Sequence, residues 1–197
     1  MSIEKIRTLL QSSNDGIIST KDVTANGIHR EYLAKMVKSG EIVRVGCGLY
    51  MKANIWEDEL YILQKRFEKG VFSHETALFL HGFTDRTPSK FTMTFPHGYT
   101  TSLLESENIN KKRVVREKYN IGIKEVKTPC NNTVRAYDLE RTLCDIVRGQ
   151  GADIQIVNEA MKRYANMKNK DIHKLISYAE ILHVKPKILK YMEILLW

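Results

Sequence analysis

The chain has 197 residues, 43% of them hydrophobic, so it can bury a core as one large domain or two small ones. Its net charge of +8 and pI of about 9.3 favour nucleic acid, an acidic protein or a membrane surface as partner. The three cysteines (Cys47, Cys130 and Cys144) are odd in number and lack metal-ligand spacing, which disfavours a disulfide framework and suits a reducing cytoplasm. No apolar run approaches the roughly 20 residues of a membrane span, and the N-terminus lacks a signal-peptide core, so we expect a cytoplasmic protein.

The stretch from Gly16 to Lys52 predicts two helices joined by a turn. Ser19 and Asp22 have the spacing of a capping box, so the first helix should begin at Thr20, and an Asn-Gly pair should end it. The second helix should run from about His29 to Ser39, where a glycine closes it. Its apolar positions fall on one side, which we expect to be buried: Leu33, Met36 and Val37.

A short β-hairpin should follow this second helix. Glu41–Val45 alternates like a strand, Gly46-Cys47-Gly48 is typical of a turn, and Leu49–Met51 is the return strand. Two helices followed by a hairpin form a winged helix-turn-helix, which places one helix in the major groove of DNA. Residues 1–52 are therefore predicted to be a DNA-binding domain.

Residue types in this segment suit the two kinds of DNA contact. Base edges would be met near the first turn of the second helix, where the candidates are Asn26, His29 and Arg30. Phosphates would be met by long cationic side chains, namely Lys21, Lys35, Lys38, Arg44 and Lys52. The alternative is that these are ordinary solvated charges, since residues 1–52 hold only eight basic against five acidic side chains, and His29 alone can cap the helix.

Residues 53–137 predict a mixed α/β module. A helix over 57–69 carries a stripe of Trp56, Leu60, Leu63 and Phe67, and a second helix is capped by Ser73 and stopped by Gly82. Alternation then predicts a strand over 91–95 and three more over 113–117, 123–127 and 133–136.

The remaining 60 residues predict four helices. Apolar stripes mark helices near 139–146, 154–164 and 172–182, and Pro186 opens the last one, at a position where proline is tolerated. These helices need one another to bury their stripes, so residues 53–197 are predicted to be one C-terminal domain. The expected fold class is α+β, with the winged helix first and a helical bundle last.

The densest basic cluster lies outside the winged helix. It consists of Lys111, Lys112, Arg113, Arg116 and Lys118, within a segment, 101–137, that holds eight basic and four acidic side chains. Such a cluster either extends a nucleic-acid footprint or forms a solvated loop.

Catalytic interpretations are weaker. Ser73, His74 and Glu75 are adjacent at a helix start, where successive side chains point about 100° apart and cannot relay a proton. His74 and His81 lack the i, i+4 spacing and the carboxylate of a helical metal site, so no metal or cofactor is expected. Glu125 and Lys127 match the acidic-x-Lys element of Mg²⁺ nucleases, for which Glu117 or Asp85 could be proposed as the second acid, although neither spacing is persuasive.

Several segments together resemble the AbiEi family, the antitoxins of type IV toxin–antitoxin systems, which are related to abortive-infection phage resistance. They are GLY at the end of the wing, SHETALFLHGFTDRTP from Ser73, FTMTFP followed by HG, and YDLERTLCDIVR from Tyr137. The resemblance covers most of residues 5–165 and is strongest over 46–98 and 137–148.

This resemblance implies a two-part protein that is not an enzyme. The winged helix would repress its own operon by binding inverted repeats in the promoter, with two copies on one operator. The C-terminal domain would neutralise a nucleotidyltransferase-like toxin without a stable complex. A stand-alone winged-helix regulator and a Mg²⁺ nuclease remain the alternatives.

Overall fold

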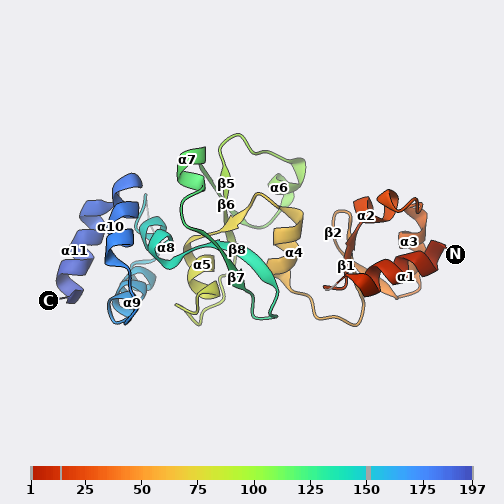
Figure 1. Cartoon of the computed structure of the whole chain (residues 1–197), viewed down its shortest axis with the longest axis horizontal. Coiled ribbons are helices and arrows are strands. Elements are labelled where there is room, and N and C mark those ends of the chain that lie inside the picture. The colour runs from red at the N-terminus through yellow and green to blue at the C-terminus, as the bar shows by residue number, and fades with distance from the viewer. Residues whose placement is uncertain (1, 14, 150–151, 197) are drawn as a thin grey trace. The chain divides into compact units, whose positions relative to one another are not determined.

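The computed structural model describes residues 2–13, 15–149 and 152–196. They form two compact units, residues 1–66 and 67–197 (Figure 1). Each unit has its own hydrophobic core. None of the helices among these residues has the length and apolar character needed to cross a membrane.

The N-terminal unit is a winged helix-turn-helix. Its elements in chain order are α1 (Ser2–Ser12), β1 (Ile17–Ser19), α2 (Thr20–Ala25), α3 (Glu31–Lys38), β2 (Ile42–Gly46), β3 (Leu49–Lys52) and α4 (Glu59–Arg66). The strands form an antiparallel sheet in the order β1-β3-β2. The helices of the turn and the wing were predicted from the sequence; α1 and β1 were not.

The core of this unit collects apolar side chains from α1, β1, α2, α3, β2 and the turn before α3. It consists of Ile6, Leu10, Ile18, Val23, Ile28, Leu33, Met36 and Ile42. The prediction that Val37 is buried with Leu33 and Met36 was wrong, because Val37 lies at the edge of the apolar stripe of α3 and is 38% exposed.

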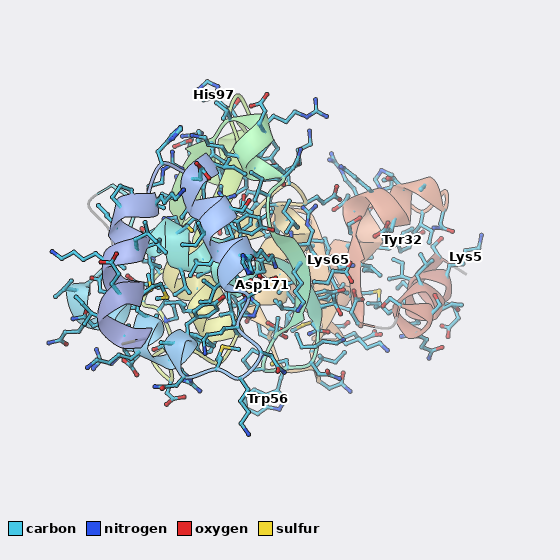
Figure 2. The ribbon with its side chains drawn as sticks, turned by 60° about the vertical axis from the view of Figure 1, so that its left-hand side comes forward. Lys5, Tyr32, Trp56, Lys65, His97 and Asp171 are labelled. Carbon is cyan, nitrogen blue, oxygen red and sulfur yellow. The ribbon has the colours of Figure 1, made fainter. Side chains whose placement is uncertain are left out.

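Helix α4 belongs to this unit, which therefore extends past residue 52. Tyr61 donates a hydrogen bond of 2.6 Å from its hydroxyl to Oδ2 of Asp15, and Lys65 forms an ion pair of 3.1 Å with the same oxygen. The apolar stripe predicted for this helix is buried at Leu60 and Leu63 but not at Trp56, which precedes the helix and is 91% exposed. Figure 2 shows Trp56 pointing away from the ribbon.

The C-terminal unit begins with a five-stranded sheet. Its elements are β4 (Val71–Phe72), α5 (His74–Leu80), β5 (Thr92–Pro96), α6 (Ser102–Ser106), β6 (Asn110–Val114), α7 (Arg116–Tyr119), β7 (Ile123–Lys127) and β8 (Thr133–Tyr137). The strand order is β6-β5-β4-β8-β7, with parallel pairs β5/β6 and β4/β8 and antiparallel pairs β4/β5 and β7/β8.

One predicted strand is displaced. The segment 113–117 was expected to be extended, but β6 ends at Val114 and α7 begins at Arg116. Its partner strand β5 ends at Pro96, which pairs with Val114, and the ladder closes with a hydrogen bond of 2.7 Å from the backbone N–H of His97 to the carbonyl of Val114.

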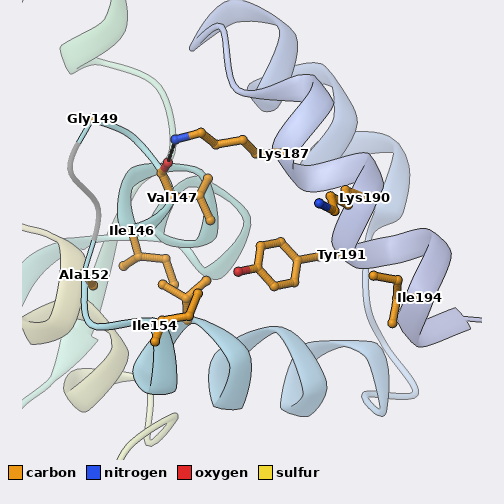
Figure 3. A pocket seen from close by; sticks show the side chains of 10 residues that line it. Ile146, Val147, Gly149, Ala152, Ile154, Lys187, Lys190, Tyr191 and Ile194 are labelled. Atoms are coloured by element: carbon orange, nitrogen blue, oxygen red, sulfur yellow. Dashed lines mark hydrogen bonds between the residues drawn. The ribbon is translucent and has the colours of Figure 1, made fainter.

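Four helices complete the unit: α8 (Leu139–Ile146), α9 (Ile154–Ala165), α10 (Ile172–Ile181) and α11 (Lys185–Leu196). They share one apolar core with Leu78 and Phe83, at and just after α5, so the bundle and the sheet form one unit. A hollow of about 360 Å³ lies between α11, the end of α8 and the start of α9 (Figure 3). The predicted α+β class, with a helical bundle at the C-terminal end, is confirmed.

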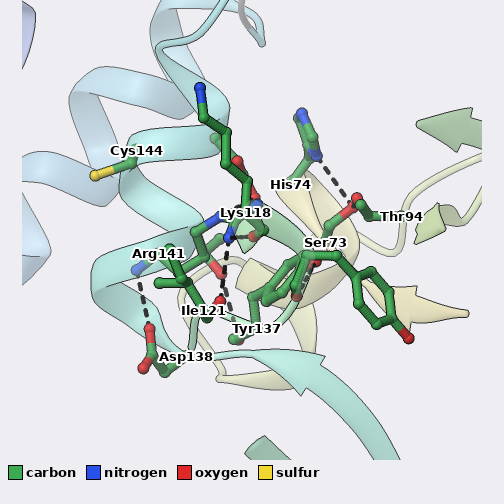
Figure 4. Close-up of polar contacts among 12 residues, drawn as sticks. Ser73, His74, Thr94, Lys118, Ile121, Tyr137, Asp138, Arg141 and Cys144 are labelled. Carbon is green, nitrogen blue, oxygen red and sulfur yellow. Dashed lines mark hydrogen bonds and ion pairs between the residues drawn. The ribbon is translucent and has the colours of Figure 1, made fainter. Parts of the chain in front are cut away.

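A buried polar cluster joins the sheet to α8 (Figure 4). Arg141 is fully buried and donates from Nε to Oδ2 of Asp145 at 3.0 Å. Its Nη1 donates to the carbonyls of Lys118 and Ile121, and its guanidinium lies 4.1 Å from the ring centre of Tyr137. These contacts neutralise the charge and fix the start of the bundle against the sheet.

Candidate nucleic-acid interface

The turn between α2 and α3 is built by local hydrogen bonds. Ser19 and Asp22 form the predicted capping box, each side chain bonding the backbone N–H of the other. The side chain of Asn26 then donates to the carbonyl of Asp22 at 2.8 Å, and Gly27 turns the chain with a φ of 69°. The amide of Asn26 is therefore already engaged in ending α2.

An open groove of about 550 Å³ lies between the start of α3 and the wing. Three of the predicted DNA-contact residues meet in it: His29 and Arg30 from the turn and the helix start, and Arg44 from β2. The groove is completed by Thr20, Glu31, Ala34, Cys47, Gly48 and Tyr50. A cationic groove beside an exposed helix is the arrangement that a duplex backbone and a base edge require.

Two residues in this groove also have structural roles. Nδ1 of His29 accepts a hydrogen bond of 3.4 Å from the backbone N–H of Glu31, whereas the N-cap position of α3 is Arg30, whose side chain makes no capping bond. Nε of Arg44 donates to the carbonyl of Gly46 at 3.2 Å, which holds its guanidinium against the wing turn.

The outward face of α3 carries Glu31, Lys35 and Lys38, all exposed. Lys35 forms an ion pair of 3.0 Å with Glu31, one turn earlier, and its Nζ lies 5.2 Å from the ring centre of Tyr32. The hydrogen bond from Lys35 lowers the pKa of Glu31, and the same bond raises the pKa of Lys35. Glu31 is thus ionised and partly cancels the positive charge of this face.

The other predicted phosphate contacts are not part of the groove. Lys52 lines a separate hollow with Arg7, Met36 and Glu41. Lys21 is exposed on α2. The structure therefore gathers His29, Arg30 and Arg44 and leaves Lys21 and Lys52 apart from them.

Sequence reasoning missed a small residue in the lining of the groove. Ala34 is exposed on α3, three residues after Glu31 and therefore on the same helix face. An alanine on an otherwise charged, exposed face lets another surface approach the helix backbone closely. That pattern was present in the sequence, as was Tyr50, whose side chain reaches the groove from β3.

The second basic cluster is divided by the strand that carries it. Lys111 and Arg113 lie on one face of β6 and both pair with Glu105, at 3.4 and 3.1 Å, which lowers the pKa of that carboxylate. Lys112 points to the opposite face. Arg116 is exposed on α7, and the carbonyl of neighbouring Lys118 accepts from Arg141.

Ser73 and His74 occupy a buried, tightly turned site between β4 and α5. Ser73 precedes the helix as predicted, but its side chain makes no capping bond; its oxygen instead accepts from the Thr94 hydroxyl at 2.8 Å. Nδ1 of His74 lies 3.1 Å from the same oxygen, and His74 has a φ of 54°. Burial, reinforced by the nearby cation Lys112, lowers the pKa of His74 to about 3, so the imidazole is neutral.

Lys127 and His81, two of the remaining candidates, have structural partners. Nζ of Lys127 donates to the carbonyl of Asn131 and the hydroxyl of Thr133, which closes the β7–β8 hairpin. Nε2 of His81 donates to the carbonyl of Tyr137 at 2.7 Å, and burial lowers its pKa. Within the described residues, no group of three or more His, Cys, Asp or Glu side chains is placed to hold a metal ion.

Comparisons with known proteins agree with this arrangement. Residues 4–51 match a family model described as "Transcriptional regulator, AbiEi antitoxin", which confirms the resemblance for the winged helix. A search of curated proteins finds no match. The structure is similar to that of the RV2827C protein from Mycobacterium tuberculosis, with a TM-score of 0.63 and 12% identity, over 96% of this chain and 78% of that one. At that identity the likeness shows the fold alone. Of the 197 residues, 4–51 are thus similar to the AbiEi antitoxin family of transcriptional regulators.

Proposed function

We propose that this protein binds operator DNA through its winged helix and represses its own operon. The observation that carries this proposal is the groove between α3 and the wing, where His29, Arg30 and Arg44 meet. The family match over the same residues supports it.

In this mechanism, α3 enters the major groove and the wing, Val45–Tyr50, lies on the adjacent phosphate backbone. Arg30, exposed at the start of α3, reads a base edge, and Arg44 neutralises a phosphate. Lys35 and Lys38 lie along the exposed face of the helix and add phosphate contacts. Asn26, whose side chain bonds the carbonyl of Asp22, helps to place His29 and Arg30, and the second N–H and the Oδ1 of its amide are left for a base edge.

The C-terminal unit is proposed to act on the second partner, a nucleotidyltransferase-like toxin, without forming a stable complex with it. Its support is the family of the winged helix, whose members are antitoxins. Lys112 and Arg116, which are exposed on β6 and α7, are the part of the second basic cluster best placed to meet an acidic partner.

The direct test is a titration of labelled DNA from upstream of the gene against a scrambled duplex of the same composition, at two salt concentrations. Specific repression requires tight binding to the native duplex alone, weakened by salt. Equal affinity for both duplexes would reject the proposal, because it would show that the protein binds DNA only through its positive charge.

The second candidate is a stand-alone winged-helix regulator, because the family match covers only residues 4–51. The two differ in the presence of a toxin. Expression of an adjacent nucleotidyltransferase gene alone should arrest growth if that gene encodes the toxin. Co-expression of this protein should restore growth if it is an antitoxin and should leave growth arrested if it is a regulator alone.

A further inference from the structure

Among the large hydrophobic side chains that the structure describes, Trp56 is the most exposed. It is 91% exposed, in the connection between β3 and α4, beside Ile55, which is also exposed. Figure 2 shows it projecting from the ribbon. Exposed tryptophan is rare because its ring is large and mostly apolar, and tryptophan is enriched where proteins meet. Glu57 and Glu59 follow it and are also exposed, so the segment combines an apolar anchor with carboxylates.

The C-terminal unit contains a hollow of the opposite character, here called the α11 groove. Four residues of α11 at i, i+3, i+4 and i+7 spacing line it, namely Lys187, Lys190, Tyr191 and Ile194. The ring of Tyr191 projects from α11 into the groove (Figure 3). Ile154 and Ile194 in its lining are 62% and 69% exposed, so an apolar surface is left uncovered.

The charges of the two surfaces are complementary. The lining of the α11 groove includes two ammonium groups and no carboxylate, whereas Trp56 is followed by two exposed carboxylates. We propose that Trp56 of one copy of this chain inserts into the α11 groove of a second copy, with Glu57 and Glu59 facing Lys190 and Lys187. If each copy inserts its tryptophan into the other, the pair closes with twofold symmetry.

The size of the contact sets its strength. The groove holds about 360 Å³, enough for an indole ring. One tryptophan buries roughly 150–250 Å², well below the roughly 1,200 Å² of a stable interface. Pairing is therefore weak in dilute solution and becomes substantial at high protein concentration, or where two copies are held close together. This pairing does not depend on DNA binding, so each of the two proposals can fail without the other.

The test uses the full chain with Trp197→Phe, which leaves Trp56 as the single tryptophan. Acrylamide quenching and sedimentation velocity are measured without DNA, from about 5 µM to about 1 mM, where weak pairing titrates. We expect the mass to rise toward that of a pair while Trp56 becomes protected from acrylamide. A mass that stays monomeric throughout would overturn the proposal, whether Trp56 is exposed or protected at every concentration.

Variants locate the contact. Trp56→Ala should weaken pairing by at least about tenfold, as loss of an anchor does. Lys190→Glu should weaken it as well, and adding Glu57→Lys to Lys190→Glu should restore it. Lys162→Glu makes the same charge change on α9 outside the groove and should leave pairing unchanged. Pairing that survives Trp56→Ala, or charge reversals without mutual rescue, would contradict the proposed contact; circular dichroism confirms that each variant is folded.

Discussion

Tyr61 and Asp15 are joined by a hydrogen bond of 2.6 Å that ties α4 to the turn before β1. Burial opposes ionisation of Asp15, but hydrogen bonds from Tyr61 and the backbone of Ile17 and the ion pair with Lys65 lower the pKa of this carboxylate overall. The helix that follows the wing is thus attached to the DNA-binding unit by a charged contact.

Replacing Tyr61 with Phe should therefore destabilise the N-terminal unit. A hydrogen bond to an ionised acceptor contributes about 1.5–3 kcal/mol to the free energy of unfolding, measurable by urea denaturation. In the background of Asp15→Asn the same substitution should cost less, because the acceptor has lost its charge. Equal losses of stability in both backgrounds would show that the charge of Asp15 does not strengthen the hydrogen bond.

Arg30→Ala and Lys38→Ala should affect DNA binding differently. Arg30 lies in the groove, so Arg30→Ala should weaken binding to the native duplex by about 1–3 kcal/mol and relax the base preference. Lys38→Ala should weaken binding to all DNA sequences alike and reduce the slope of log affinity against log salt concentration by about one. Lys162→Ala, in the C-terminal unit, is the matched control. Unchanged binding by both winged-helix variants would reject α3 as the reading helix.

The stability of the C-terminal unit should depend strongly on both members of the buried ion pair of α8, Arg141 and Asp145. Arg141→Met alone or Asp145→Leu alone leaves an unpaired buried charge and should reduce the free energy of unfolding by about 3–5 kcal/mol. The double variant removes both charges and should recover much of this loss. Thermal denaturation of the four proteins tests it; a double variant as unstable as the sum of the singles would show that the pair is not coupled.

Gly122 should tolerate substitution far less well than Gly82. Both have positive φ, 78° and 67°, so alanine strains the backbone at either position. At Gly122, however, a Cβ would lie 2.8 Å from Cβ of Arg141 and 3.0 Å from Oδ1 of Asp138, whereas at Gly82 nothing lies within 4 Å. The melting temperature of Gly122→Ala should therefore be lower than that of Gly82→Ala, and the difference measures the close packing of Gly122 against the start of α8. Similar melting temperatures would contradict this prediction.

His74 should make stability depend on pH. Its pKa is about 3 in the folded protein and 6.5 when unperturbed, so between these values the unfolded chain binds a proton that the folded chain does not. Stability should be full above pH 6.5 and should fall as the pH drops toward 4. His74→Asn retains a residue that accepts the φ of 54° and should flatten this dependence. Parallel pH profiles for the two proteins would show that His74 does not control it.

The parts of the fold encoded locally were predictable from sequence. The capping box of Ser19 and Asp22, the wing glycines and the stripes of α8 to α11 each lie within a few residues of chain. Features that depend on distant partners were not predictable from the sequence. Strand β1, for example, is three residues long and exists because β3 pairs with it. The register of β6 follows from where β5 ends.

The same distinction holds for the candidate interface. The sequence named His29, Arg30 and Arg44, but it could not show that Lys52 belongs to a different hollow, because that depends on where β3 runs beside α1 and α3. Nor could it show that Trp56 lies outside the stripe of α4, because the helix begins only at Glu59.

Glu31 has a consequence for how such a protein would search a chromosome. Its carboxylate, although paired with Lys35, lines the same groove as Arg30 and Arg44, where it repels an approaching phosphate and favours a hydrogen-bond donor such as the amino group of cytosine. Most duplex in a cell is not operator, and on that DNA the repulsion shortens each encounter. The acid therefore favours fast release from wrong sites over a tighter hold on the right one.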